Sequence, residues 1–201
     1  PWLIGELPLG ECGIILSWHD TLSRPSDLFQ KAAAMQDISG INIVTMAWRA
    51  RSLRDNLDAF ELLQRRQQPM IVLCMGPYGL MSRILEPNFG GFATFATIDG
   101  HEATADGQPT TTELQTKYNF ESINADTKVY GVIGENVQHS ASPHFHNAAF
   151  AAAGTNAVYL PLPIPSGWEH LKATTLCLTH DERIDFSGAS ITIPHKEHML
   201  K

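Results

Sequence analysis

The sequence predicts an α/β protein with parallel strands, and three observations carry this prediction. Short apolar runs alternate along the chain with amphipathic stretches, which is the pattern of consecutive β-α units. The connections between them are short and rich in Gly, Pro, Ser and Asp, as turns are. Hydrophobic residues make up 43% of the 201 residues and charged residues 17%, which is enough apolar material for a packed core.

The first 120 residues contain four such units. Apolar runs predict strands at 13–17, 41–46, 70–75 and 93–97, and amphipathic stretches predict helices at 26–36, 52–67, 81–85 and 111–118. In the second helix, Leu53, Leu57, Phe60 and Leu63 recur at helical spacing on one face. Four units are half of a (β/α)8 barrel, which typically needs about 250 residues. We therefore expect a partial barrel over residues 1–120.

A second β-α pattern follows a polar segment without periodicity, residues 121–128, which we expect to be a linker. Strands are predicted at 129–133, 157–160 and 189–193, with helices at 142–153 and 168–178. Ser142 supplies a capping hydroxyl and Pro143 the first helical position, while Gly154 ends that helix. The residues from His195 onward are typical of the first turn of another helix. Residues 129–201 are therefore expected to be the start of a second α/β domain.

Composition and charge exclude several classes of function. The chain has 14 Lys and Arg against 21 Asp and Glu, a net charge of −7, which disfavours nucleic acid and anionic membranes as partners. No apolar run approaches the roughly 18 residues of a membrane span. Cys12, Cys74 and Cys177 are odd in number and widely spaced, which predicts reduced thiols and no metal site.

The chain begins with Pro1 rather than Met and has no signal-peptide pattern. We expect it to be a piece of a longer protein. The cysteine usage favours the cytoplasm, with organelle targeting left open because the true N-terminus is expected to lie elsewhere.

Hydroxyls and a lysine gather at the predicted carboxyl ends of strands in the second segment. Ser140 and Ser142 follow the strand at 129–133, and Thr192 and Lys196 close the strand at 189–193. Open α/β sheets bind ligands at this end, and three hydroxyls with one amine suit a small polyhydroxylated acid. The alternatives are loop and cap chemistry for the two serines and a solvated surface position for the lysine.

The first segment has its own polar candidates. His19 closes the first strand, where barrel enzymes place catalytic groups, and Arg83 follows a Gly-rich turn, where it can bind a carboxylate bidentately. Thr104 and Gln108 lie in a loop able to contact a polar ligand. The alternatives are a hydrogen-bonded loop histidine, a surface salt bridge and a plain Asp-Gly turn.

The second segment resembles the shikimate dehydrogenase family. The motifs are His139-Ser140-Ala141-Ser142-Pro143-His144-Phe145-His146-Asn147 and Ser190-Ile191-Thr192-Ile193-Pro194-His195-Lys196, where Ser190 and Ile191 replace the usual Asn and Val. The resemblance implies that Ser140, Ser142 and Thr192 hold the hydroxyls and carboxylate of shikimate. It implies that Lys196 transfers a proton at the carbon that exchanges hydride with NADP. No Gly-x-Gly-x-x-Gly occurs in the chain, so NADP is expected on a domain missing from it.

The first segment is similar to the second half of a type I 3-dehydroquinate dehydratase, over about residues 10 to 120. The motifs are Ser17-Trp18-His19-Asp20, Met75-Gly76-Pro77-Tyr78-Gly79-Leu80-Met81-Ser82-Arg83, Phe89-Gly90-Gly91-Phe92-Ala93-Thr94-Phe95 and Ala105-Asp106-Gly107-Gln108. The order of the two resemblances is that of fused shikimate-pathway enzymes. The family's Asp-Ile-Val-Lys stands here as Asn42-Ile43-Val44-Thr45. Since Thr45 cannot form the Schiff base that this lysine forms in the family, we expect impaired dehydratase chemistry, with His19, Arg83 and Gln108 kept as base and ligand contacts.

Three interpretations follow. In the first, the parent protein interconverts 3-dehydroshikimate and shikimate with NADP and carries a dehydratase-like barrel of doubtful activity. Its partners are then small-molecule substrates: shikimate, 3-dehydroshikimate and, if the barrel still binds it, 3-dehydroquinate. Alternatively, it is a non-catalytic quinate- or shikimate-sensing protein with the same domains. The third interpretation is that this chain alone is an inactive fragment with open sheet edges, which are prone to aggregation.

Overall fold

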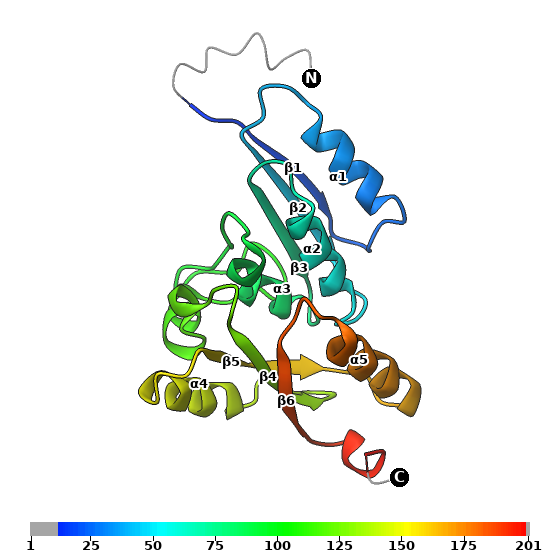
Figure 1. Ribbon diagram of the computed structural model, residues 1–201, viewed down its shortest axis with the longest axis vertical. Helices are drawn as coiled ribbons and strands as arrows, with labels where there is room; N and C mark the ends of the chain where they lie inside the picture. The colour runs from blue at the N-terminus through cyan, green and yellow to red at the C-terminus, as the bar shows by residue number, and fades with distance from the viewer. Residues whose placement is uncertain (1–11, 200–201) are drawn as a thin grey trace.

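The computed structural model describes residues 12–199, which form two parallel sheets of three strands each (Figure 1). The first sheet has the order β1-β2-β3 and the second the order β5-β4-β6. The strands are β1 (Ile15–Asp20), β2 (Ile43–Arg49), β3 (Met70–Met75), β4 (Lys128–Gly134), β5 (Ala157–Pro163) and β6 (Phe186–Ile191). The helices are α1 (Leu28–Gln36), α2 (Asp55–Gln64), α3 (Leu80–Ile84), α4 (Ser142–Ala152) and α5 (Trp168–His180).

The first sheet places alternate residues of each strand on opposite faces, as strands do. The helix-covered face carries large apolar side chains such as Trp48, Met46 and Val72, which are fully buried. The other face carries Thr45, and the parallel register sets it between Ser17 on β1 and Ile71 on β3. By the same register, His19 on β1, which pairs with Ala47, lies on this second face.

The predicted strand at 93–97 is wrong. Phe92 N donates to Met70 O at 2.8 Å, so pairing with β3 begins, but no backbone hydrogen bond joins residues 93–97 to β3. Ala93 N donates instead to the Glu86 carboxylate at 3.3 Å, and an isolated bridge pairs Thr97 with Thr110. The apolar pattern of this segment came from side chains such as Phe95, which is exposed. The first sheet consequently has three strands rather than four.

Short helical turns connect the two sheets. The predicted helix at 111–118 contains a five-residue π-helix, η3 (Glu113–Lys117), and 3₁₀ turns form at η2 (Glu86–Phe89), η4 (Phe120–Ser122) and η5 (His195–Glu197). The predicted turn from His195 onward agrees with η5, and its last residues, 200–201, lie outside the described residues, as do residues 1–11 of the predicted partial barrel.

The start of α4 differs from the expected cap. Ser142 makes no capping hydrogen bond with its side chain. Instead, Ser140 Oγ accepts a hydrogen bond from Ser142 N at 3.2 Å, so the hydroxyl two residues earlier shapes this turn. The end of the helix follows the prediction, because Gly154 adopts φ 63° just after α4.

The two sheets share one core. A single cluster of buried apolar side chains runs from Phe60 and Met81 in the first unit to Leu160 and Leu171 in the second. Polar groups also join the units: Asn147 Nδ2 donates to Lys117 O at 2.9 Å, and Arg183 lies 3.8 Å from Glu61. The segment predicted as a free linker is packed, since Ile123 is buried. No helix within residues 12–199 is long and apolar enough to cross a membrane.

Candidate functional site

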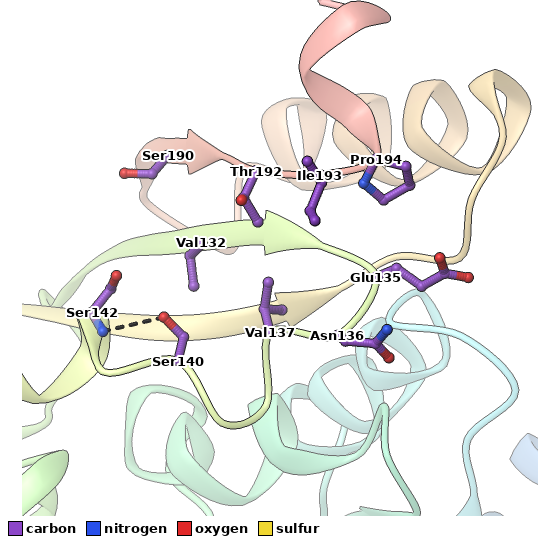
Figure 2. Close-up of a pocket in the computed structure, with 10 residues that line it drawn as sticks. All are labelled: Val132, Glu135, Asn136, Val137, Ser140, Ser142, Ser190, Thr192, Ile193 and Pro194. Atoms are coloured by element: carbon purple, nitrogen blue, oxygen red, sulfur yellow. Dashed lines mark hydrogen bonds between the residues drawn. The ribbon is translucent and has the colours of Figure 1, made fainter.

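A cavity of about 500 Å³ opens between the β4–α4 loop and the end of β6 (Figure 2). It brings together three of the predicted site residues, because Ser140, Ser142 and Thr192 all line it. The other lining residues are Val132, Glu135, Asn136, Val137, Ser190, Ile193 and Pro194. The cavity is thus apolar at its base and bordered by hydroxyls from two segments about 50 residues apart.

The close approach of those two segments depends on Gly134, the last residue of β4. A Cβ atom added there would meet Thr192 Cγ2 at 2.5 Å and Val137 Cγ1 at 2.7 Å. Thr192 N donates to Ile133 O at 2.8 Å, which fixes the backbone of the threonine beside the strand end. The glycine therefore allows Thr192 to face the serines across the cavity.

Lys196 lies near this cavity but not in its wall. It is in η5, two residues after the lining residue Pro194, and it is exposed. Its neighbour His195 is fully buried and its Nε2 atom bonds Ile164 O at 2.9 Å. Because the carbonyl can only accept, His195 Nε2 is the donor. This bond ties the turn that carries Lys196 to the residue after β5.

The sequence reasoning missed several residues of the cavity. Glu135 and Asn136 line it from the loop between Gly134 and Ser140, and their position between two recognised motifs was a usable signal. Tyr159 was also missed: its hydroxyl donates to Ser190 Oγ at 2.9 Å. No motif points to Tyr159, because it reads as an ordinary apolar position of β5.

Asn147, the last residue of the first motif, is structural. Its amide nitrogen donates to Tyr159 O at 2.9 Å and its amide oxygen accepts from Tyr159 N at 2.7 Å. The same nitrogen donates to Lys117 O. Asn147 is 1% exposed, so these bonds are made in the interior, where an unpaired amide is costly. It fixes α4, and with it Ser142, against β5.

Arg83 in the first unit is buried, and it does not form the surface salt bridge that was the alternative prediction. It is 2% exposed, its Nε has no hydrogen-bond partner, and it forms no ion pair within residues 12–199. Burial lowers the pKa of Arg83 from its usual value, with smaller opposing effects from Cys74 and Asp106. A buried guanidinium without an ion-pair partner can bind an anion, and a carboxylate fits its planar pair of donors.

Thr104 and Gln108 form a turn together. Gln108 Oε1 accepts hydrogen bonds from Thr104 Oγ1 at 2.9 Å and from Ala105 N at 3.2 Å. The loop is held to the end of β3, because Gly76 N donates to Asp106 O at 2.9 Å, and Arg49 forms an ion pair with Asp106 at 3.0 Å. The predicted alternative of a turn is therefore present, and it leaves the amide nitrogen of Gln108 for a ligand.

His19 and Thr45 lie on neighbouring strands. His19 is exposed on β1 and pairs in register with Ala47. Thr45 is 1% exposed and its hydroxyl has no hydrogen-bond partner. Among residues 12–199, no hydrogen bond or ion pair joins His19, Arg83 and the Gln108 turn to one another.

Two other buried titratable groups belong to the first unit. Burial raises the pKa of Glu86 to about 8, partly offset by the hydrogen bond from Ala93 N. Burial also raises the pKa of the Cys74 thiol well above its usual value, so this cysteine is an inert core residue. No group of three or more His, Cys, Asp or Glu side chains in the described part of the chain has the arrangement to hold a metal ion.

The two glycines of β4, Gly131 and Gly134, do not form a dinucleotide-binding loop. Such loops use glycine so that the backbone can approach a pyrophosphate. Here a Cβ at Gly131 would collide with Leu162, and one at Gly134 would meet Thr192 and Val137. These glycines make room for protein side chains, and we therefore derive no step through NADP from these residues.

Comparisons with known proteins divide the chain at the same region as the two sheets. A family model for type I 3-dehydroquinase matches residues 4–125, and one for the shikimate dehydrogenase substrate binding domain matches residues 132–201. The chain is 42% identical over 199 residues to the chloroplastic bifunctional 3-dehydroquinate dehydratase/shikimate dehydrogenase of Arabidopsis thaliana, covering 98% of this chain and 32% of that protein. It thus spans about a third of that relative.

One further relative matches the second unit alone, and one solved structure matches both units. A shikimate dehydrogenase (NADP(+)) of Microcystis aeruginosa is 50% identical over 74 residues, which is 37% of this chain and 24% of that protein. The solved structure of the dehydroquinate dehydratase and shikimate dehydrogenase from S. pombe AroM has 27% identity and a TM-score of 0.46, covering 95% of this chain and 35% of that one.

Proposed function

Since the chain belongs to the type I 3-dehydroquinase family and continues into a shikimate dehydrogenase substrate-binding domain, we propose that the whole protein interconverts 3-dehydroshikimate and shikimate with NADP. One observation carries this proposal above the others. Ser140, Ser142 and Thr192, which the motif resemblance assigns to shikimate, line a single cavity.

The chemistry of the cavity supports a small hydroxylated acid. Each hydroxyl offers one donor and two acceptor positions, so the three side chains bind either hydroxyls or a carboxylate of the ligand. Val132 and Val137 provide an apolar floor for the carbon ring. A volume of about 500 Å³ lies in the range of small-molecule sites.

Lys196 is the proposed proton-transferring residue. It donates a proton to, or accepts one from, the oxygen on the carbon that changes oxidation state, as a positioned general acid and base. Its exposure in this chain leaves its amine free to reach the cavity mouth, while the His195 bond to Ile164 holds the turn below it. When bound, NADP would exchange a hydride with that carbon, given by its reduced form and accepted by its oxidised form, and we place its site on a part of the whole protein outside these residues.

For the first unit we propose ligand binding without the usual dehydratase chemistry. Thr45 has no amine, so it cannot form an iminium with a ketone. Arg83, buried and without an ion-pair partner among residues 12–199, is the proposed carboxylate contact, with Gln108 and Thr104 as further ligand contacts and His19 as a base. Borohydride treatment with 3-dehydroquinate followed by mass spectrometry should find no substrate adduct on a lysine. A stable adduct would contradict this part of the proposal.

The decisive experiment uses the full-length protein. NADPH absorbance is followed first after adding 3-dehydroquinate and then after adding 3-dehydroshikimate to the same cuvette. We expect NADPH loss only at the second addition. Loss at the first addition would mean that both units are active and that the role assigned to Thr45 is wrong.

The second candidate is a sensing protein that binds quinate or shikimate without turnover. The replacement at Thr45 and the unpartnered Arg83 favour it for the first unit. In the same cuvette it predicts no NADPH loss at either addition, combined with a rise in melting temperature when shikimate is added.

A further inference from the structure

We propose that Asn56 and Ser82 are positioning residues for Arg83, and that together they hold its guanidinium where the carboxylate of a small acid binds in the first unit. The inference rests on the ligand binding proposed for this unit and deepens it. Asn56 belongs to none of the sequence motifs and lies in the first turn of α2. α2 and α3 both pack against β3 and against each other (Figure 1).

The guanidinium of Arg83 has no charged partner that fixes its position. It is 2% exposed, its Nε has no hydrogen-bond partner, and no ion pair holds it within residues 12–199. α3, which carries it, has only five residues and no side-chain cap, and a helix this short is not stable by itself. The place of Arg83 therefore depends on the bonds that hold α3 against the rest of the unit.

Ser82, the residue before Arg83, is held at both its backbone and its side chain. Ser82 N donates to Asn56 Oδ1 at 2.9 Å. Ser82 Oγ accepts from Cys74 N at 2.8 Å and donates to Gly79 O at 2.8 Å. Each bond joins a side-chain atom to a backbone N–H or carbonyl, so the backbone group fixes its direction. These bonds hold the chain directly before Arg83 against β3 and α2.

Asn56 joins the start of α2 to the turn before α3. Its Nδ2 donates to Leu53 O and to Tyr78 O, both at 2.8 Å, while its Oδ1 accepts from Ser82 N. Asn56 and Ser82 are both 0% exposed, so these bonds are made in the interior, where an unpaired polar group is costly. One amide thus holds both ends of the segment 78–82, which leads into Arg83.

The close approach of this segment to β3 requires the glycine at position 79. A Cβ atom on Gly79 would lie 2.4 Å from Cys74 O and 2.9 Å from Met75 N, so a larger side chain would push α3 away from the strand. With Gly79 in contact with the strand, Ser82 Oγ reaches Cys74 N. The contact at Gly79 and the bonds of Asn56 and Ser82 therefore act on the same short helix.

The consequence for a ligand follows from the geometry of the guanidinium. A carboxylate binds it best through two parallel N–H···O bonds, which depend on alignment. Both protons of the Asn56 amide are donated to protein carbonyls, so Asn56 offers none to a ligand. Its effect on binding passes through Ser82 to Arg83.

The test measures the dissociation constant (Kd) of 3-dehydroquinate by calorimetry in the full-length protein, with saturating shikimate present to occupy the β4–β6 cavity. Asn56→Ala and Ser82→Ala should each raise this Kd about tenfold, the order expected when a hydrogen bond to a charged group loses its alignment. The Kd of shikimate, measured separately, should not change in either variant. Ser82→Ala removes a single atom and decides the outcome if Asn56→Ala does not fold.

Asn147→Ala is the matched control. Asn147 is also a buried asparagine with three hydrogen bonds to backbone groups, but these bonds hold α4 against β5 and η3. The control should lower the melting temperature as Asn56→Ala does and leave the Kd of 3-dehydroquinate unchanged.

Two results would contradict the inference, and they are distinguishable. If Ser82→Ala and any folded Asn56→Ala lose stability but keep the original Kd, the network is structural only and the inference alone is overturned. If the unmodified protein does not bind 3-dehydroquinate, or Arg83→Met binds it equally well, the ligand contact proposed for the first unit is overturned as well.

Discussion

The β1–β3 unit and the β4–β6 unit differ in how many of their buried polar side-chain atoms have hydrogen-bond partners. In the second unit the hydroxyls near the cavity have hydrogen-bond partners: Ser140 Oγ accepts from Ser142 N, and the Tyr159 hydroxyl bonds Ser190 Oγ. In the first unit polar atoms are buried without partners. Within residues 12–199 they include Thr45 Oγ1, Trp48 Nε1, Arg83 Nε, Thr94 Oγ1 and Thr97 Oγ1, whereas the second unit has only ring nitrogens of His195 and His198 in this state.

The difference indicates which unit is organised for a ligand on its own. A buried polar atom without a partner costs about 1–3 kcal/mol unless another group bonds it. The second unit avoids most of this cost with its own residues and has a formed cavity. The first unit leaves more of its buried polar atoms without a partner among residues 12–199. Four substitutions test this contrast, in order of decreasing expected effect.

Lys196→Met is expected to have the largest effect, confined to the second unit. Loss of a general acid and base should lower kcat with shikimate about 100-fold or more, while shikimate still raises the melting temperature. Lys172→Met, an exposed lysine on α5, is the control and should be neutral. A kcat close to that of the original protein would remove Lys196 from the reaction.

Glu86→Gln should change the pH dependence of stability through the first unit. The pKa of Glu86 is raised to about 8 from 4.5, so between these values the folded state holds a proton that the unfolded state releases. The free energy of unfolding therefore falls as pH rises through this window, by roughly 5 kcal/mol at most. Glu86→Gln should flatten the curve and stabilise the protein at pH 8.

Melting temperatures from pH 5 to pH 8.5 check this expectation. Glu182→Gln, at an exposed position, should leave the curve as it was. A curve for Glu86→Gln that still falls in parallel with that of the original protein would show that Glu86 is ionised in the folded state at pH 7.

Asn147→Ala tests the junction between the units. It removes three interior hydrogen bonds, two to Tyr159 and one to Lys117, and should lower the free energy of unfolding by about 3 kcal/mol. Gln115→Ala, an exposed amide on η3, should cost little. Denaturant unfolding measures both, and equal midpoints for the two variants would refute the structural role of Asn147.

Arg83→Met should have the smallest and least usual effect. Removing a buried cation that lacks an ion-pair partner should stabilise the ligand-free protein by about 1–2 kcal/mol. The same change should abolish any rise in melting temperature caused by 3-dehydroquinate. Arg54→Met, at an exposed arginine, should do neither. A destabilised variant that keeps its response to the ligand would show that Arg83 is structural.

The sequence predicted most strands and helices because apolar runs and caps are local signals. The strand at 70–75 has the predicted bounds, and α4 begins and ends within one residue of its prediction. The prediction at 93–97 failed because pairing with β3 ends at Phe92, and residues 93–97 make no backbone hydrogen bond with that strand. Local hydrophobicity carries no information about such long-range pairing.

The same limit applies to the site. Ser140, Ser142 and Thr192 were found from motifs and meet in one cavity, because the carboxyl ends of parallel strands share an edge. Tyr159 was not found, since its contribution depends on reaching Ser190 across β4. The sequence also did not predict the burial of Arg83, because nothing near it distinguishes a buried arginine from a surface one.

Asn147 makes the two units poor building blocks for recombination. A breakpoint placed in residues 121–128 looks harmless on the printed sequence, yet it would strip Lys117 O from the asparagine and uncover Ile123. An engineer who grafts the second unit onto another barrel must therefore carry η3 and η4 with it. The segment that can be exchanged intact therefore begins near Glu113, within the residues that the sequence analysis assigned to the partial barrel.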